Sequence, residues 1–285
     1  MGLMMKNVKT LTLIAAAVAA MTTGTVQAEQ YYGFANVSVN YLDWTDGTED
    51  RTRDTQNGFG VKSDFVYIEV EGGAGYNWGD VYGFIDFENP GKGDFGYSDS
   101  EDSSEAFRIA AKGSVAVNIG ETNWNYYGHL YSISDSSGFY EQNVVLGVSY
   151  DINTDFGLWV KPFLGAHYVH NSAIGAGFNG GMGGWVLGYN FKMAGQDFMV
   201  TNWNEIEFAR VDEYRGFCTT DTCTGPGDAG FQNINGKSTG LNGAVALWWN
   251  VSSEFTLGVQ YRYADNKLGT AAYQNAAIFS AKYNF

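Results

Sequence analysis

Apolar and polar residues alternate along much of this chain, and its last stretch shows the pattern most clearly. Its apolar positions, each two residues from the next, are Ala277, Phe279, Ala281, Tyr283 and Phe285. Such a period of two predicts a β-strand with one apolar face. An apolar strand at the edge of a soluble sheet invites aggregation, whereas a closed barrel in a membrane has no edge and gives its apolar face to lipid.

Twelve segments of about ten residues show the same alternation, which is the length that a tilted membrane strand requires. They span residues 31–44, 59–74, 79–89, 104–118, 123–133, 141–152, 156–169, 184–193, 198–210, 240–251, 255–264 and 272–285. The pattern predicts an all-β protein made of one closed antiparallel transmembrane β-barrel of about twelve strands.

The connections between these segments alternate in length. The short ones, which follow even-numbered strands, are 75–78, 119–122, 153–155, 194–197 and 252–254. The long ones, rich in Asp, Ser, Gly and Thr, include 45–58, 89–103, 170–183 and 211–239. Short periplasmic turns and long extracellular loops are typical of outer-membrane barrels. An even strand number also brings both chain ends to the periplasmic side.

The N-terminal residues have the features of a secretory signal peptide. Lys6 and Lys9 precede the apolar run 11–20, and 26–28 offers a small-residue cleavage site. A membrane anchor needs about 20 apolar residues, and polar residues from Thr22 onward interrupt the run too early. We therefore predict a cleaved signal over 1–28 and a single barrel domain over 29–285, located in the outer membrane.

Composition narrows the function classes. The chain has 16% aromatic residues, 38 glycines and only 3 prolines, which suits strands better than helices. Its formal net charge of -15 argues against a nucleic-acid partner, which calls for a basic surface. Cys218 and Cys223 are too few for a disulfide-built scaffold, and no further metal ligand lies nearby. In an oxidising compartment we expect these two cysteines to form a disulfide.

The charged side chains of the strands are expected to face the lumen, because a charge facing lipid costs about 2 to 4 kcal/mol at the bilayer midplane. On 59–74, for example, Val66 and Val70 belong to the lipid-facing set. The predicted lumen residues, which form a hypothetical substrate path, are Tyr67, Glu69, Glu71, Tyr82, Phe84, Asp86, Glu88, Arg108, Lys112, Lys161, His167, Trp203, Glu205, Glu207 and Arg262, with Lys282 as a further base.

Two interpretations of this lumen compete. In one, aromatic rings stack on a flat solute while neighbouring charges hydrogen-bond its polar edges, each stack contributing about 1 to 3 kcal/mol. In the other, acids and bases neutralise one another across the lumen and the aromatics are filler or interface girdle. The second interpretation is favoured for any single residue, and a passage for small solutes for the set as a whole.

Catalysis and metal binding find little support. His129 and His167 share the inward phase and His170 follows them, but no Gly-x-Ser-x-Gly nucleophile elbow occurs, so no enzyme is predicted. The acidic loop residues that a loosely bound calcium ion would need are Asp43, Asp46, Glu49 and Asp50, or Asp99, Glu101 and Asp102. Solvated acidic loops explain both groups more simply, so neither a metal nor a cofactor is predicted.

Four short stretches carry a family resemblance. They are 80–86 (DVYGFID), 143–154 (NVVLGVSYDINT), 201–204 (TNWN) and 282–285 (KYNF). Together they resemble the nucleoside-specific channel-forming (Tsx-like) outer-membrane proteins over essentially the whole chain after the signal. The resemblance implies a twelve-stranded monomeric barrel that passes nucleosides and serves bacteriophages as a surface receptor. It also implies that Tyr82, Phe84 and Asp86 line the substrate path, and that the barrel-insertion machinery recognises Phe285.

We therefore expect an outer-membrane channel for passive uptake of small polar solutes, nucleosides in particular, that bacteriophages also use as a receptor. The alternative is a surface docking protein or structural barrel with little selective transport. The loops 89–103 and 211–239 are long enough to form a docking face. Outer-membrane lipid surrounds the barrel under either hypothesis.

Overall fold

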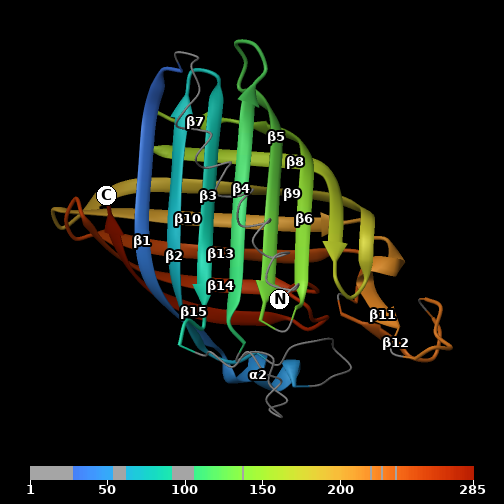
Figure 1. Ribbon diagram of the computed structural model, residues 1–285. Coiled ribbons are helices and arrows are strands. Elements are labelled where there is room, and N and C mark those ends of the chain that lie inside the picture. The colour runs from blue at the N-terminus through green and yellow to red at the C-terminus, as the bar shows by residue number, and fades with distance from the viewer. Residues whose placement is uncertain are drawn as a thin grey trace, which may run out of the picture.

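The computed structural model describes residues 28–53, 62–91, 106–136, 138–218, 220–225, 227–234 and 236–285. The predicted signal peptide lies outside these ranges except for Ala28, so its cleavage stays a prediction. Antiparallel strands make up most of the described chain (Figure 1). Neither of its helices, α2 (Asp46–Thr52) nor the short 3-10 helix η3 (Asp212–Arg215), is long and apolar enough to cross a membrane.

Twelve strands follow one another around one sheet. They are β1 (Gln30–Trp44), β2 (Phe65–Tyr76), β3 (Gly79–Glu88), β4 (Arg108–Asn118), β5 (Trp124–Asp135), β6 (Tyr140–Tyr150), β8 (Leu158–Asn171), β9 (Gly175–Met193), β10 (Gln196–Phe208), β13 (Gly240–Asn250), β14 (Phe255–Asp265) and β15 (Gln274–Asn284). The two-residue strand β7 (Ile152–Asn153) continues β6 along β8, and β11 (Gly216–Cys218) and β12 (Phe231–Asn233) form a separate hairpin.

Pairing between the first and last strands closes the sheet. β1 pairs with β15 from Asn36↔Asn284 to Trp44↔Ala276, and β6 pairs with β8, so the order of the strands returns to its starting point. The predicted fold class, a closed twelve-stranded antiparallel barrel, is confirmed. Strands β1 to β6 run at a steep angle to the strands of the opposite wall (Figure 1), as strand tilt in a barrel requires.

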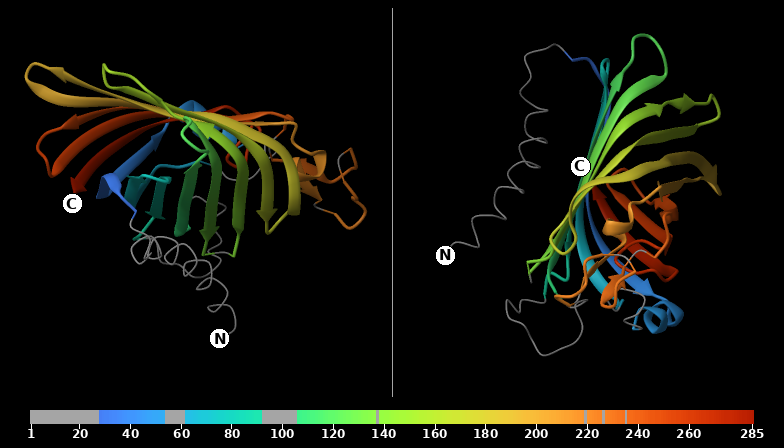
Figure 2. Two further views of the ribbon diagram at one scale, coloured as in Figure 1. Left: turned by 90° about the horizontal axis from the view of Figure 1, so that it is seen from above. Right: turned by 90° about the vertical axis from the view of Figure 1, so that its right-hand side faces the viewer.

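The barrel has two different ends, which we call the loop end and the turn end. At the loop end lie α2, which follows β1, and the β11–β12 hairpin, which follows β10 (Figure 2). At the turn end lie the start of β1, the end of β15 and short connections such as Ala194–Gly195 between β9 and β10. The predicted alternation of short and long connections is therefore present, with one exception.

The exception is the predicted long loop 170–183, which is wrong. Here β8 continues to Asn171 and β9 already begins at Gly175, so only three residues connect them. The many glycines of this stretch suggest a loop, but in the structure they belong to β9, where neighbouring backbone leaves no space for a side chain at Gly180. Gly180 adopts φ +75°, and a Cβ atom there would collide with the Phe208 and Ala209 carbonyl oxygens.

The loop between β1 and β2 folds over the loop end. Thr45 caps α2 by accepting a hydrogen bond from the Thr48 backbone N–H at 3.3 Å. The buried Thr48 hydroxyl in turn donates to the Asn275 carbonyl oxygen at 3.1 Å, which ties α2 to the start of β15. Beneath this contact lies an apolar cluster made of Leu42, Trp44, Phe65, Tyr67, Ala276 and Ile278.

The long loop between β10 and β13 carries the β11–β12 hairpin. Cys218, at the end of β11, forms a disulfide with Cys223, so the disulfide closes a small ring of chain inside this loop.

On the outer face at the turn end, aromatic rings stack from strand to strand. The centroids of Tyr189 and Phe191 are 5.8 Å apart, and those of Phe191 and Phe198 are 5.6 Å apart. Such girdles mark a membrane interface.

Candidate functional site

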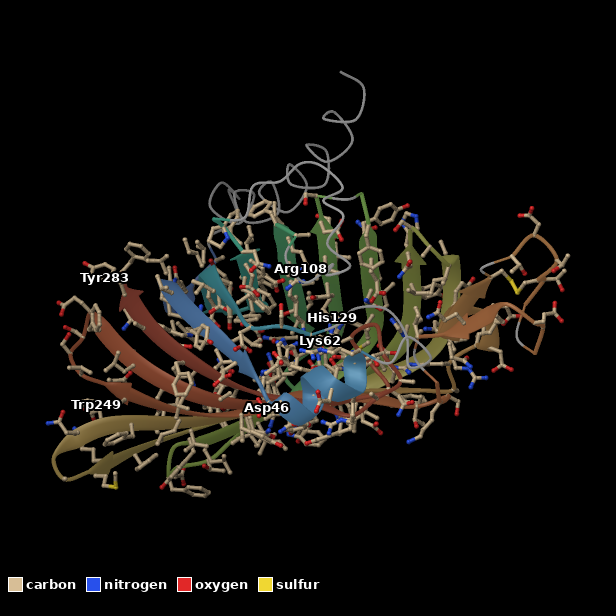
Figure 3. The ribbon with its side chains drawn as sticks, turned by 90° about the horizontal axis from the view of Figure 1, so that it is seen from below. Asp46, Lys62, Arg108, His129, Trp249 and Tyr283 are labelled. Carbon is tan, nitrogen blue, oxygen red and sulfur yellow. A yellow bond between two sulfur atoms is a disulfide. The ribbon has the colours of Figure 1, made fainter. Side chains whose placement is uncertain are left out.

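Alternation along each strand separates a lumen face from an outer face. On β2, Val66 and Val70 are 44% and 46% exposed, whereas Tyr67 between them is only 7% exposed. Figure 3, a view into the loop end, shows Arg108 and His129 inside the barrel, whereas Trp249 and Tyr283 lie on its outer surface. The charged side chains of the strands therefore point into the lumen, because a charge that faces lipid is costly.

Acidic side chains line one wall of the lumen, on β2 and β3. Glu69 pairs in register with Asp86, and Glu71 pairs with Phe84, which is followed on β4 by Lys112. Towards the turn end, the Tyr82 hydroxyl donates to a Glu71 carboxylate oxygen at 2.8 Å.

Basic side chains from neighbouring strands neutralise part of this wall. Lys282 on β15 lies 2.9 Å from Glu71 and 3.8 Å from Glu69, and its ammonium lies 4.2 Å from the centre of the Trp248 ring. Nearer the loop end, Arg108 on β4 forms an ion pair with Glu88 on β3 at 2.5 Å. These pairs join adjacent parts of the wall and leave the middle of the lumen uncrossed.

Other ion pairs cross the lumen. Lys112 on β4 lies 2.6 Å from Glu205 on β10, and these strands stand five steps apart around the ring (β4, β5, β6, β8, β9, β10). Lys161 on β8 forms ion pairs with Asp80 on β3 and, at 3.2 Å, with Asp151 after β6. A charge pair that spans nearly opposite walls narrows the passage at that level.

The loop between β14 and β15 adds a further cation to the lumen. Lys267 lies 3.0 Å from Glu205 and 3.1 Å from Glu207, and Arg210 forms a second ion pair with Glu207. Burial by itself would lower the pKa of Lys267, but the charges of Glu207 and Glu205 outweigh it and raise this pKa. Lys267 thus stays charged and neutralises the acids of β10.

Lys62, just before β2, also lies at the loop end but, unlike Lys267, has no acidic partner in the described chain. Its ammonium donates to the Leu268 carbonyl oxygen at 2.9 Å, and among the described residues it has no carboxylate within ion-pair distance. Burial, followed by the charges of Arg108 and Arg262, lowers the pKa of Lys62 to about 8. Figure 3 places Lys62 in the middle of the loop-end opening.

Arg262 and Asp86, like Lys62, form no ion pair with a described residue. The Arg262 guanidinium lies 5.6 Å from the centre of the Trp203 ring, its Nε is buried without a hydrogen-bond partner, and it has no ion pair with a described residue. Asp86 Oδ1 is likewise buried without a partner. Asp86, Tyr67 and Arg262 are close enough to interact electrostatically. A polar donor, an acceptor and an aromatic face are thus available together.

The histidines bond to neutral side chains. His167 Nε2 lies 2.7 Å from the Asn143 amide oxygen, and His129 Nδ1 lies 3.1 Å from the Tyr127 hydroxyl, both inside the barrel. His170 is exposed, 3.0 Å from the Tyr140 hydroxyl. Within the described ranges, no group of three or more His, Cys, Asp or Glu side chains is placed to hold a metal ion. Asp99, Glu101 and Asp102 lie outside those ranges.

Sequence reasoning missed three of the charges that meet at the loop end. In the structure all three, Lys62, Lys267 and Arg210, lie in connections. The predicted strands 59–74 and 198–210 included Lys62 and Arg210, but β2 begins only at Phe65 and β10 ends at Phe208, so strand alternation does not set the direction of these side chains. The pattern offered no signal that the chain would fold these connections back over the lumen. In contrast, Glu205 and Glu207, predicted from their phase on β10, do lie among these bases.

A family model described as the nucleoside-specific channel-forming protein Tsx matches residues 39–285. The chain belongs to this family. It is therefore a nucleoside-specific channel of the outer membrane, in a family that is not enzymatic. In this setting the turn end of the barrel is periplasmic and the loop end is extracellular.

Solved structures with a similar barrel include the NanC porin, at 9% identity and a TM-score of 0.45, with 87% of this chain and 98% of that chain covered. An outer membrane channel from Pseudomonas putida F1 has 10% identity and a TM-score of 0.42, over 92% of this chain and 100% of that one. Likenesses this distant say nothing about what this chain transports.

The pair that crosses the lumen yields a first prediction. Replacing Lys112 by alanine removes a side chain that spans from β4 to β10, so we expect single-channel conductance in planar bilayers to rise. Lys267 still neutralises Glu205 in this variant, so the barrel should refold. Lys192→Ala, which removes an exposed lysine at the periplasmic end, should leave conductance unchanged. Equal conductance in both variants would show that the pair does not restrict the passage.

The two buried lysines of the loop end predict opposite effects on stability. Lys267→Met leaves two glutamates short of a cation, and we expect a loss of about 3 kcal/mol, the lower end for breaking a buried ion pair, because Lys112 and Arg210 remain. Lys62→Met removes a buried charge without an acidic partner, so stability should be unchanged or higher. Urea unfolding of the refolded barrel in detergent measures both, and a greater loss in Lys62→Met would contradict this account.

Proposed function

We propose that nucleosides pass through this lumen by way of a binding position formed by Asp86, Arg262 and Trp203. The supporting observation is that Asp86 Oδ1 and Arg262 Nε are buried without hydrogen-bond partners and that Arg262 lies against the Trp203 ring, whereas charges such as Lys112 and Glu71 are in ion pairs. A buried polar group without a partner loses the hydrogen bonds that it had in water, so a solute that restores them is favoured.

The chemistry of a nucleoside matches these groups. Its flat base has polar edges that accept from a guanidinium, and its sugar hydroxyls donate to a carboxylate. The base also presents a face to Trp203, and stacking on an aromatic side chain contributes about 1 to 3 kcal/mol. A sugar offers hydroxyl groups but no flat ring, so it gains only part of this stabilisation. The position thereby favours nucleosides over solutes of similar size.

The other lumen residues form the remainder of the proposed path. Glu69 pairs in register with Asp86, and Tyr67, Glu88 and Arg108 lie nearer the loop end of the same wall. Nearer the periplasmic end lie Glu71, Tyr82, Phe84, Lys112 and Lys161, and β8 and β10 contribute His167, Glu205 and Glu207. The ion pairs among them hold polar atoms at fixed places along the wall. A solute leaving Arg262 therefore meets further donors and acceptors without crossing an apolar stretch.

Flux through liposomes tests this proposal. Radiolabelled nucleosides, compared with sugars and amino acids of similar size, should show saturable flux through the refolded barrel. We expect Asp86→Asn and Arg262→Met each to weaken nucleoside binding and so to raise the half-saturation concentration about tenfold, equivalent to about 1.4 kcal/mol. Tyr82→Ala should have a smaller effect, and Lys192→Met, at the periplasmic surface, none. Identical flux for every solute, or variants indistinguishable from Lys192→Met, would refute this binding position.

We further propose that the extracellular loops serve as a docking face for bacteriophages. The supporting feature is the β11–β12 hairpin, which stands at the loop end and holds the Cys218–Cys223 disulfide (Figure 2). Phage would then exploit an exposed structure whose use to the cell is transport. Under the alternative function, docking would be the main role and selective transport small.

Deleting residues 218–227 separates these roles. We expect phage adsorption to cells to be lost and nucleoside flux in liposomes to stay within about twofold, because the deletion leaves all barrel strands intact. A shift in cell-surface abundance must be excluded by antibody staining of an epitope inserted elsewhere. Loss of both adsorption and flux would contradict the division between loops and lumen.

Within the family, we propose that this chain is similar to the vibrio protein OmpK, on the four short stretches already described.

We also propose that residues 1–28 are removed as a signal peptide and that Phe285 contacts the barrel-insertion machinery. The Phe285 ring is 80% exposed beside Tyr283, so it is accessible to another protein. Mass spectrometry of the protein purified from outer membranes should give a chain that begins at Glu29.

A further inference from the structure

Three cations meet at the extracellular opening of the lumen, and each lies against an aromatic ring. The distances from charge centre to ring centre are 5.8 Å for Lys62 and Trp44, 4.9 Å for Arg108 and Phe65, and 5.6 Å for Arg262 and Trp203. An aromatic face attracts a cation without neutralising its charge. These contacts therefore orient the cations without neutralising them, although Arg108 is also paired with Glu88.

Strand register places Arg262 in a row between two of the aromatic residues, Trp44 and Trp203. Trp44 pairs with Ala276, Ala276 pairs with Arg262, and Arg262 pairs with Ala244, which pairs with Trp203. All five residues lie in one row across the sheet. The two alanines on either side of Arg262 are small and almost fully buried.

Lys62 is held above this row by the loop between β1 and β2. Its backbone N–H donates to the Thr52 hydroxyl at 3.0 Å, and its ammonium donates to the Leu268 carbonyl oxygen at 2.9 Å. An ammonium has three donor hydrogens, so one contact with a carbonyl leaves others unused. Figure 3 shows Lys62 near the centre of the opening and Arg108 inside the barrel above it in this view.

Among the described residues, these three cations have a single ion-pair partner between them. Glu88 forms an ion pair with Arg108, whereas neither Lys62 nor Arg262 has an ion pair with any described residue. Asp86 interacts electrostatically with Arg262 but forms no ion pair with it, and the charges of Arg108 and Arg262 help to lower the pKa of Lys62. Partly buried cations repel one another, and a bound anion would reduce that repulsion and so stabilise them.

We infer that Lys62, Arg108 and Arg262 form an anion-binding site at the extracellular opening that takes a phosphate group, either free or as part of a nucleoside monophosphate. A guanidinium binds phosphate oxygens through two parallel hydrogen bonds, and lysine adds a compact charge. The site goes beyond nucleoside passage, because phosphate binding needs Lys62, which the proposed nucleoside position does not use.

Equilibrium dialysis of the refolded full-length barrel against radiolabelled inorganic phosphate tests the site. We expect saturable binding that Lys62→Met weakens by about tenfold, the effect of losing one charge-assisted hydrogen bond. Lys62→Arg should restore most of the affinity. Lys237→Met removes an exposed lysine from an extracellular loop and should leave binding unchanged. Absence of saturable binding, or equal binding by Lys62→Met and Lys237→Met, would overturn the inference.

Competition identifies the source of the phosphate group. Adenosine monophosphate and unlabelled phosphate are each tested for displacing the labelled phosphate. If adenosine monophosphate displaces it at far lower concentration, the site is supported and its ligand is a nucleotide. Equal displacement would support the site with free phosphate as its ligand. Adenosine flux through liposomes, measured on Lys62→Met, should match the wild type. Failure of nucleoside selectivity in the wild type would therefore leave the phosphate result standing, and the two proposals fail separately.

Discussion

Closure of the sheet is the constraint on which every other feature of this protein depends. A backbone amide in hydrocarbon has no water to bond, so each strand must have a partner on both sides. The nine residue pairs between β1 and β15 supply that partner for the two outermost strands of the sequence. Because the ring closes, every strand has one face towards lipid and one towards the lumen, and the period of two becomes a division between the two environments.

This division concentrates charge in a narrow space. Lysine and glutamate side chains that lipid would reject are directed inwards, where they neutralise one another, as Lys112 does with Glu205. The pairs stabilise the barrel and at the same time occupy its passage, so stability and permeability oppose each other. Arg262 and Asp86 stand apart from this balance. Their unused hydrogen-bonding capacity is where a passing solute gains most, which is the physical basis of the proposed selectivity.

Much of the barrel follows from the sequence because lipid exposure imposes a regular pattern. The alternation on β2 and β3 predicted both the strands and the inward phase of Glu69, Glu71 and Asp86. The prediction failed at 170–183, where glycines that resemble a loop instead allow β9 to pack closely against β8 and the end of β10. Glycine permits both loops and crowded strands, so composition alone does not distinguish them.

By itself, the sequence determined the strand number, the face of each strand and the kind of residue that lines the lumen, because these properties depend on local alternation and on the cost of charge in lipid. The tertiary structure decided which charges meet. Lys62 and Lys267 come from loops far apart in sequence and reach the same opening, one without an acidic partner and one between two glutamates. Pairing of this kind depends on ring closure and on how connections fold over the barrel, and neither has a period that a sequence can display.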